Sequence, residues 1–221
     1  MKPILIHTHF HRRKTGVTRS IENVLSYFSK HFETYVYGNN ISGKSLSKTQ
    51  LKRILKSENE VVIHCHRNNE IIRMLWHRFV GRNFKLIATR HAATEPSKLT
   101  RFLLNKADSV ITLTNEMSEN LGIPNTLIGH GVQTEVFIPK QDASLPEVKQ
   151  QKIILNTGRI RESKGQQDLI KAAKILRQHP NWALVFVGRV DKSDFLVKLK
   201  GLAKQHNIND QVYFFDETKE I

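Results

Sequence analysis

Short apolar runs alternate with segments of helical spacing along this chain. Ile4 to Ile6 form the first such run, which is typical of a buried parallel strand, and residues 21–28 then repeat apolar side chains every three or four positions. Thr18 is the expected N-cap of this first helix. The pattern predicts strands at 2–9, 34–37, 61–65, 85–89, 110–114, 126–128, 152–157, 183–187 and 211–215, and helices at 21–28, 46–55, 69–80, 99–104, 164–178 and 194–205.

Strands that alternate with helices form parallel sheets through right-handed crossovers. The sequence therefore predicts an α/β fold with doubly wound sheets. Residues 139–151 contain two prolines and no apolar period, which is typical of a linker. We expect a Rossmann-like domain at 1–138, a linker at 139–151, and the first half of a second Rossmann-like domain at 152–221.

The composition is that of a soluble globular protein, with 39% hydrophobic and 25% charged residues. No apolar run is long enough to cross a membrane, and the first residues lack the apolar core of a signal peptide. The single cysteine, Cys65, excludes an internal disulfide framework and agrees with a reducing compartment. We therefore expect a cytoplasmic protein.

The formal net charge is +15, and most of the excess lies in the first 140 residues. Such a field favours an anionic partner, which is a nucleic acid, an anionic membrane face or a phosphorylated substrate. The helix predicted at 69–80 adds basic residues opposite a broad apolar side. A helix of this kind packs on a sheet more often than it lies on a membrane, so we expect packing and keep membrane contact as the alternative.

The segment after the predicted strand 152–157 combines a glycine turn with positive charge. Gly158 ends the strand, and Ser163 with Gln166 matches a capping box at the start of the next helix. Arg159 and Lys164 crowd this helix N-terminus, where the macrodipole is already positive, so the arrangement suits a bound anion. The segment predicts a phosphate-binding loop, with a solvated basic loop as the alternative.

Doubly wound sheets bind ligands beyond the carboxyl ends of their strands. Three further marked segments follow predicted strands, namely Thr15-Gly16, Arg90-His91 and Gly129-His130-Gly131. Two α/β domains joined by a linker would face these strand ends across a cleft. Cations, glycines and a histidine in such a cleft suit a nucleoside-diphosphate ligand.

These segments together resemble a known enzyme family. Gly158-Arg159 followed by Lys164-Gly165 is similar to the donor-diphosphate motif of GT4-type glycosyltransferases, which have the GT-B fold. The tract from His130 to Pro139 resembles the inter-domain signature of that group. The tracts 12–18 and 90–97 resemble a narrower branch, the bacterial lipopolysaccharide-core mannosyltransferases. Relative to this family, the chain is expected to be C-terminally truncated, with the second Rossmann-like domain incomplete.

The resemblance implies roles for particular residues. Arg159 and Lys164 would bind the donor diphosphate, together with Gly158, and stabilise the charge that develops on the departing nucleotide. Gly16 would let the backbone of its loop approach the donor phosphate and the acceptor. His91 would lie near the transferred sugar and help to position it. Enzymes of this family retain the anomeric configuration, and neither a metal nor another cofactor is expected.

The resemblance also implies the substrates and the location. The donor would be a GDP- or UDP-hexose, with mannose as the favoured sugar, and the acceptor would be the lipopolysaccharide core or a related glycolipid. We expect a peripheral protein on the inner face of the cytoplasmic membrane and no nucleic-acid partner.

Two other classes of protein are open alternatives. His7 and His9 place two imidazoles on one face of a strand, as in metal-dependent hydrolases, and His64 and His66 repeat that spacing. No Asp or Glu at a strand end completes such a site. The other alternative is a non-catalytic module that binds nucleic acid through a basic face, although the cations are scattered and no nucleic-acid-binding motif is present.

Overall fold

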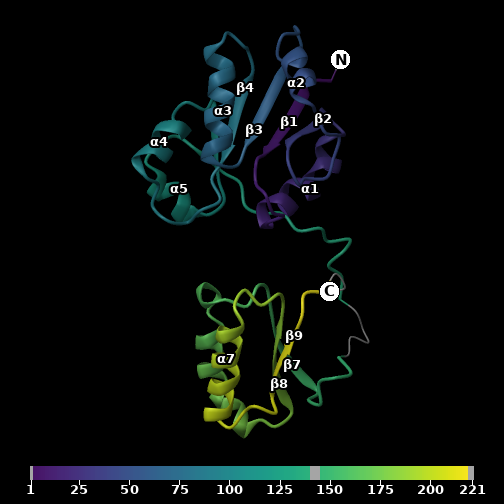
Figure 1. Ribbon diagram of the computed structural model, residues 1–221, viewed down its shortest axis with the longest axis vertical. Helices are drawn as coiled ribbons and strands as arrows, with labels where there is room; N and C mark the ends of the chain where they lie inside the picture. Colours follow the sequence, from purple (N-terminus) through teal and green to yellow (C-terminus); the bar gives the residue numbers. More distant parts are fainter. Residues whose placement is uncertain (1, 140–144, 219–221) are drawn as a thin grey trace. The chain divides into compact units, whose positions relative to one another are not determined.

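The computed structural model describes residues 2–139 and 145–218. The chain divides into two compact units, Met1–Ile138 and Pro139–Ile221. Parallel strands and helices build both units (Figure 1). The alternation of strand and helix patterns along the sequence therefore produces an α/β structure, as predicted.

Six parallel strands form the sheet of the first unit among the described residues, in the order β2-β1-β3-β4-β5-β6. The order reverses between β1 and β3, so the crevice beyond their carboxyl ends is the place where doubly wound sheets bind ligands. The strands are β1 (Ile4–His9), β2 (Glu33–Gly38), β3 (Val61–Cys65), β4 (Lys85–Thr89), β5 (Ser109–Thr112) and β6 (Thr126–Leu127). The helices are α1 (Gly16–Phe28), α2 (Lys48–Ile54), α3 (Asn68–Phe79), α4 (Lys98–Leu104) and α5 (Asn115–Leu121).

The two faces of this sheet differ in chemistry. On one face Ile6 and Ile63 belong to an apolar core that includes Met74 of α3. On the other face His7 of β1 lies in register with His64 of β3, and the ring of His7 contacts α1. Figure 1 shows α1 and α3 on opposite sides of the sheet. Since side chains alternate along a strand, the apolar core and the imidazoles are separated by the sheet itself.

The start of α1 differs from the prediction that Thr18 caps it. Thr15 is the N-cap, and its backbone N–H donates to Thr18 Oγ1 at 2.9 Å while the Thr18 N–H donates to Thr15 Oγ1 at 3.4 Å. This reciprocal capping box satisfies two backbone donors and makes Gly16 the first helical residue. The predicted cap was wrong because Thr18 occupies the third position of the same box.

Helix α3 buries only part of its predicted apolar side. Ile71 is 2% exposed and packs in the core, whereas Trp76 is 63% and Phe79 80% exposed. The two aromatic rings stack on each other with centroids 5.5 Å apart. The helix therefore packs on the sheet, as expected, but only one edge of its apolar side is buried. The aromatic edge stays at the surface.

The pattern missed one helix. Helix α5 begins after its N-cap Thr114, where a strand was predicted to end, and stops at Gly122 in the left-handed conformation. Its short polar sequence has only two buried side chains, Met117 and Leu121, too few for a clear apolar period. The strands predicted at 61–65 and 85–89 match β3 and β4 fully.

The second unit has a parallel sheet of three strands in the described residues, in the order β7-β8-β9. Its core joins Leu184 and Phe186 of the central strand to Ile170 and Leu199 of the helices. Figure 1 shows α7 running along this sheet. The strands are β7 (Lys152–Thr157), β8 (Trp182–Val187) and β9 (Val212–Phe215), and the helical segments are η1 (Glu162–Lys164), α6 (Gln166–Ala172), η2 (Ala173–Gln178) and α7 (Ser193–Gln205).

The segment predicted as a linker, 139–151, is described only in part, because 140–144 lie outside the described residues. Its later part packs on the second sheet. Val148 is 9% exposed and contacts Ala183 and Val185 in a small apolar cluster. These contacts place the later part of the segment in the second unit.

Candidate functional site

The predicted diphosphate loop of the second unit begins where β7 and β8 end side by side. The N–H of Gly158 donates to the carbonyl of Val187 at 2.9 Å. Gly188, which has a φ of +151°, lies so close that a Cβ on it would be 2.2 Å from the carbonyl oxygen of Gly158. The two strand-end turns therefore pack backbone to backbone, and this contact fixes the start of the loop.

A buried glutamine holds the rest of the loop. The Gln166 side chain is 1% exposed, and its Nε2 donates to the carbonyl of Arg159 at 3.0 Å while its Oε1 accepts from the N–H of Arg161 at 3.4 Å. The predicted capping box of Ser163 with Gln166 was wrong, because Gly165 in the left-handed conformation is the N-cap of α6 and no side chain caps the helix. Gln166 instead turns inward and fixes the loop backbone.

The two predicted donor-binding cations are both at the surface. The Arg159 side chain is 44% exposed, and its guanidinium lies 3.5 Å from the Asp191 carboxylate. The Lys164 side chain is exposed and makes no ion pair or hydrogen bond within the described residues. Asp191, which the sequence analysis did not identify, therefore orients Arg159, whereas the ammonium of Lys164 is available to an anion.

The strand ends of the first unit bring the predicted His91 beside two other histidines. His91 Nε2 lies 3.1 Å from His66 Nδ1 in a hydrogen bond, and its ring stacks on His130 with centroids 6.1 Å apart. His66 and His91 line a cavity of about 610 Å³ that also includes Val17 at the start of α1. Three of the segments marked in the sequence thus meet at one edge of this sheet, and Gly16 adjoins the cavity through Val17.

The electrostatic state of His91 follows from its surroundings. Burial, together with the nearby His130 and Arg67, lowers the pKa of the His91 imidazole to about 4. The ring is therefore neutral near pH 7 and can exchange hydrogen bonds with a hydroxyl, but it carries no charge that would neutralise a phosphate.

A buried carboxylate behind these histidines was missed in the sequence. Glu70 is 0% exposed and accepts hydrogen bonds from the backbone N–H of His66 at 2.7 Å and of Phe10 at 3.3 Å. It also pairs with Arg67 at 3.2 Å, and Arg67 donates to Thr15 Oγ1 at 3.1 Å. Glu70 thereby ties the ends of β1 and β3 to the start of α1. The only signal in the sequence that could have identified Glu70 is its position in the first turn of α3.

The hydrolase alternative needed His7 and His9 to share a ligand. His9 uses both ring nitrogens, with Nε2 2.7 Å from Thr18 Oγ1 and Nδ1 2.6 Å from the carbonyl of Asn39. His7 instead lies against His64 and His66. The pairing that this alternative assumed is therefore wrong.

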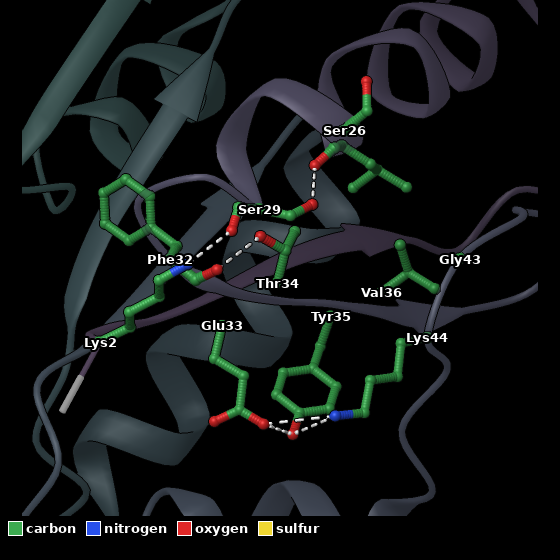
Figure 2. A pocket seen from close by; sticks show the side chains of 11 residues that line it. Lys2, Ser26, Ser29, Phe32, Glu33, Thr34, Tyr35, Val36, Gly43 and Lys44 are labelled. Atoms are coloured by element: carbon green, nitrogen blue, oxygen red, sulfur yellow. Dashed lines mark hydrogen bonds and ion pairs between the residues drawn. The ribbon is translucent and has the colours of Figure 1, made fainter.

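Another cavity, also of about 610 Å³, lies between α1 and β2 (Figure 2). Two of its charged groups pair with each other, since Lys44 contacts Glu33 at 3.3 Å and also the hydroxyl of Tyr35 at 3.1 Å. Lys2 donates to the carbonyl of Ser29 at 3.0 Å. None of the predicted site residues lines it, so it has no part in the candidate site.

Among the described residues, no helix has the length and apolar character that crossing a membrane requires.

Comparisons with known proteins agree with these features. Residues 137–221 match the family model of glycosyl transferases group 1. The lipopolysaccharide core biosynthesis mannosyltransferase LpcC of Rhizobium leguminosarum bv. viciae is 29% identical over 168 residues, which are 72% of this chain and 48% of that protein. The mannosyltransferase LpsB of Rhizobium meliloti is 26% identical over 171 residues, with the same coverage. The chain thus spans about half the length of the curated relatives it matches.

Solved structures show the same architecture. HepE of Anabaena, determined in complex with UDP and glucose, superposes with a TM-score of 0.77 at 12% identity. The superposed region covers 99% of this chain and 70% of the HepE chain. The lipopolysaccharide outer core galactosyltransferase WaaB gives a TM-score of 0.65 at 16% identity, covering 99% and 69%. The expected resemblance is confirmed: the chain has the GT-B fold with a partial second domain, is similar to lipopolysaccharide-core mannosyltransferases, and matches the model of glycosyl transferases group 1 over residues 137–221.

Proposed function

We propose that this protein transfers a hexose, with mannose favoured, from a GDP- or UDP-sugar to the lipopolysaccharide core or a related glycolipid, with retention of configuration. The observation that carries the proposal is the loop from Gly158 to Gly165. Gln166 holds the backbone of this loop, and the loop presents the cations of Arg159 and Lys164 at the surface. The names of the mannosyltransferase relatives support the sugar and the acceptor, and the UDP bound in HepE supports a nucleotide-sugar donor.

In this proposal the loop stabilises the nucleotide that leaves when the sugar is transferred. Bond cleavage between the sugar and the diphosphate leaves negative charge on the departing nucleotide, and fixed cations stabilise such charge more strongly than reorganising water does. Arg159, oriented by Asp191, and the unpaired Lys164 would supply this stabilisation, with Gly158 allowing the close approach of a phosphate. The neutral His91 would hold a hydroxyl of the sugar, and Gly16 would admit the donor and acceptor near the start of α1.

Calorimetry with GDP, UDP and their hexose derivatives tests this assignment. Arg159→Ala and Lys164→Ala should each weaken binding of the preferred nucleotide about 10- to 100-fold, because a charge-assisted hydrogen bond contributes about 1.5–3 kcal/mol. Lys174→Ala, an exposed cation of η2, is the matched control and should leave the affinity unchanged.

Two results would contradict the assignment. One is equal nucleotide affinity in the wild type and in both loop variants. The other is a loss of affinity in Lys174→Ala as large as in Lys164→Ala, since that would indicate a general effect of charge.

We also propose that the protein is peripheral on the inner face of the cytoplasmic membrane and touches it through α3. The support is the aromatic edge of this helix, where Ile72, Trp76, Phe79 and Val80 are 45–80% exposed. Exposed aromatic side chains beside basic residues are typical of helices that lie in a membrane interface. The net charge of +15 would add attraction to anionic lipid.

Co-sedimentation with vesicles of phosphatidylglycerol and phosphatidylcholine checks this contact. The wild type should partition to the anionic vesicles, and Trp76→Ala combined with Phe79→Ala should reduce the partition coefficient at least about tenfold through lost apolar burial. Val197→Ala removes a side chain that is 69% exposed on α7 and serves as the control. Equal partition of the double variant and the wild type would refute a role for α3.

A further inference from the structure

Three histidines meet on the α1 face of the first sheet. His7 and His64 are register neighbours with ring centroids 4.9 Å apart, and His66 lies 4.3 Å from His64 and 5.7 Å from His7. One ring nitrogen from each lies within 4.8 Å of the other two. Imidazole is the commonest metal ligand in proteins, and here two lie on the adjacent strands β1 and β3 and the third directly follows β3.

Two of the rings each use one nitrogen in a hydrogen bond to a residue outside the cluster. His64 Nε2 bonds Thr89 Oγ1 at 2.7 Å, and His66 Nδ1 bonds His91 Nε2 at 3.1 Å. Metal-binding histidines use their second nitrogen in this way, which fixes the ring and its tautomer. His64 Nδ1 and His66 Nε2 are therefore the candidate ligand atoms.

His7 supplies the third donor. Its Nδ1 lies 3.4 Å from His66 Nε2 and is the candidate ligand atom, while its Nε2 is buried without a hydrogen-bond partner among the described residues. Two nitrogens bound to one tetrahedral zinc ion at about 2.0–2.1 Å are separated by about 3.4 Å. The observed separation thus equals that of two ligands of one ion, and it is long for a hydrogen bond.

The cluster is neutral and contains no carboxylate. Burial lowers the pKa of His7 to about 4 and the pKa values of His64 and His66 well below their usual range, so all three rings keep their lone pairs near pH 7. The nearby carboxylate of Glu70 is taken up by Thr8, Arg67 and backbone N–H groups. An all-imidazole set favours zinc, nickel, copper or cobalt over magnesium or calcium, which prefer oxygen ligands.

We propose that His7, His64 and His66 bind one divalent transition-metal ion, with Zn²⁺ as the favoured ion. Three protein ligands leave a fourth position for water or another small ligand. The ion would join β1 to β3 and, through the hydrogen bond of His66 to His91, would fix the ring that lines the cavity at the strand ends. This site lies in the first unit, whereas the proposed diphosphate loop lies in the second, and metal binding does not depend on the transferase reaction.

Metal titration of the whole chain, after removal of metal with EDTA, tests the site. Calorimetry with Zn²⁺ should show one ion per chain with a Kd below about 10 μM, and Co²⁺ should give the visible absorption of a low-symmetry site. Saturating Zn²⁺ should raise the Tm by about 5 °C. His64→Gln and His66→Gln should each weaken binding at least about 100-fold, because each removes a ligand.

The control is His31→Gln combined with His179→Gln, which removes two exposed histidines outside the cluster. It should bind Zn²⁺ as the wild type does. Circular dichroism of the metal-free variants checks their folding, and the partly exposed His64 allows the test even if a substitution at the buried His7 unfolds the protein. The proposal is overturned if the wild type shows no saturable binding, if binding survives both single substitutions in the cluster, or if the control abolishes it.

Discussion

Replacing Glu70 with alanine should lower the free energy of unfolding by about 3–5 kcal/mol, because removal of one partner of a buried ion pair leaves the other partner unpaired. The carboxylate is fully buried, pairs with Arg67 and accepts the backbone N–H groups of Phe10 and His66. Each buried donor left without an acceptor costs about 1–3 kcal/mol more. Urea unfolding followed by circular dichroism measures the loss.

The matched control is Glu60→Ala. Glu60 also pairs with a cation, Lys85, at 3.2 Å, but its side chain is 62% exposed. Exposed pairs contribute about 0–1 kcal/mol, so this variant should unfold at nearly the wild-type urea concentration. Glu70→Gln keeps the shape and loses the charge, and we expect it to fall between the two. If Glu70→Ala and Glu60→Ala lower the free energy of unfolding by similar amounts, the buried network of Glu70 contributes no more to stability than an exposed ion pair does.

Replacing Gly188 with alanine should lower the free energy of unfolding by about 3 kcal/mol and also weaken nucleotide binding. The φ of Gly188 is +151°, and its Cβ would lie 2.2 Å from the carbonyl oxygen of Gly158, so the substitution strains its own backbone and displaces the neighbouring turn. Because Gly158 begins the proposed diphosphate loop, the displacement should reach Arg159. Urea unfolding and calorimetry with GDP and UDP measure the two effects.

Gly201→Ala provides the control for this prediction. Gly201 lies within α7, and a Cβ there would meet nothing within 4 Å. Alanine in a helix interior is favoured over glycine by about 0.5–1 kcal/mol, so this variant should be slightly more stable and bind nucleotide normally. If Gly188→Ala unfolds at the wild-type urea concentration, the two turns are not fixed by their close packing.

The proposed diphosphate loop shows how far local sequence reasoning extends. An apolar strand, a glycine and two cations located the turn at Gly158 correctly, because a strand end and a glycine are local signals. The same reasoning failed at Ser163 and Gln166, since the capping-box spacing is identical whether a glutamine bonds its own helix start or turns inward. Only the packing of Gln166 beneath the loop decides between these two uses.

Helix α3 shows a second limit. Its period correctly predicted a helix with an apolar side, and Ile71 does enter the core. The period could not indicate how much of that side the sheet covers, which depends on the angle at which the helix packs. Trp76 and Phe79 therefore had the same apolar pattern as the core residues, although they lie at the surface.

The sequence by itself determined the α/β class, the order of the strands and of the helices other than α5, and the segments at the strand ends that resemble glycosyltransferase motifs, because all of these depend on residues close together along the chain. Tertiary structure alone decided which distant groups meet. It brought His7, His64 and His66 together, and it set Glu70 under the ends of β1 and β3. These contacts depend on the parallel order and register of strands far apart in sequence, which the local period of any one strand does not encode.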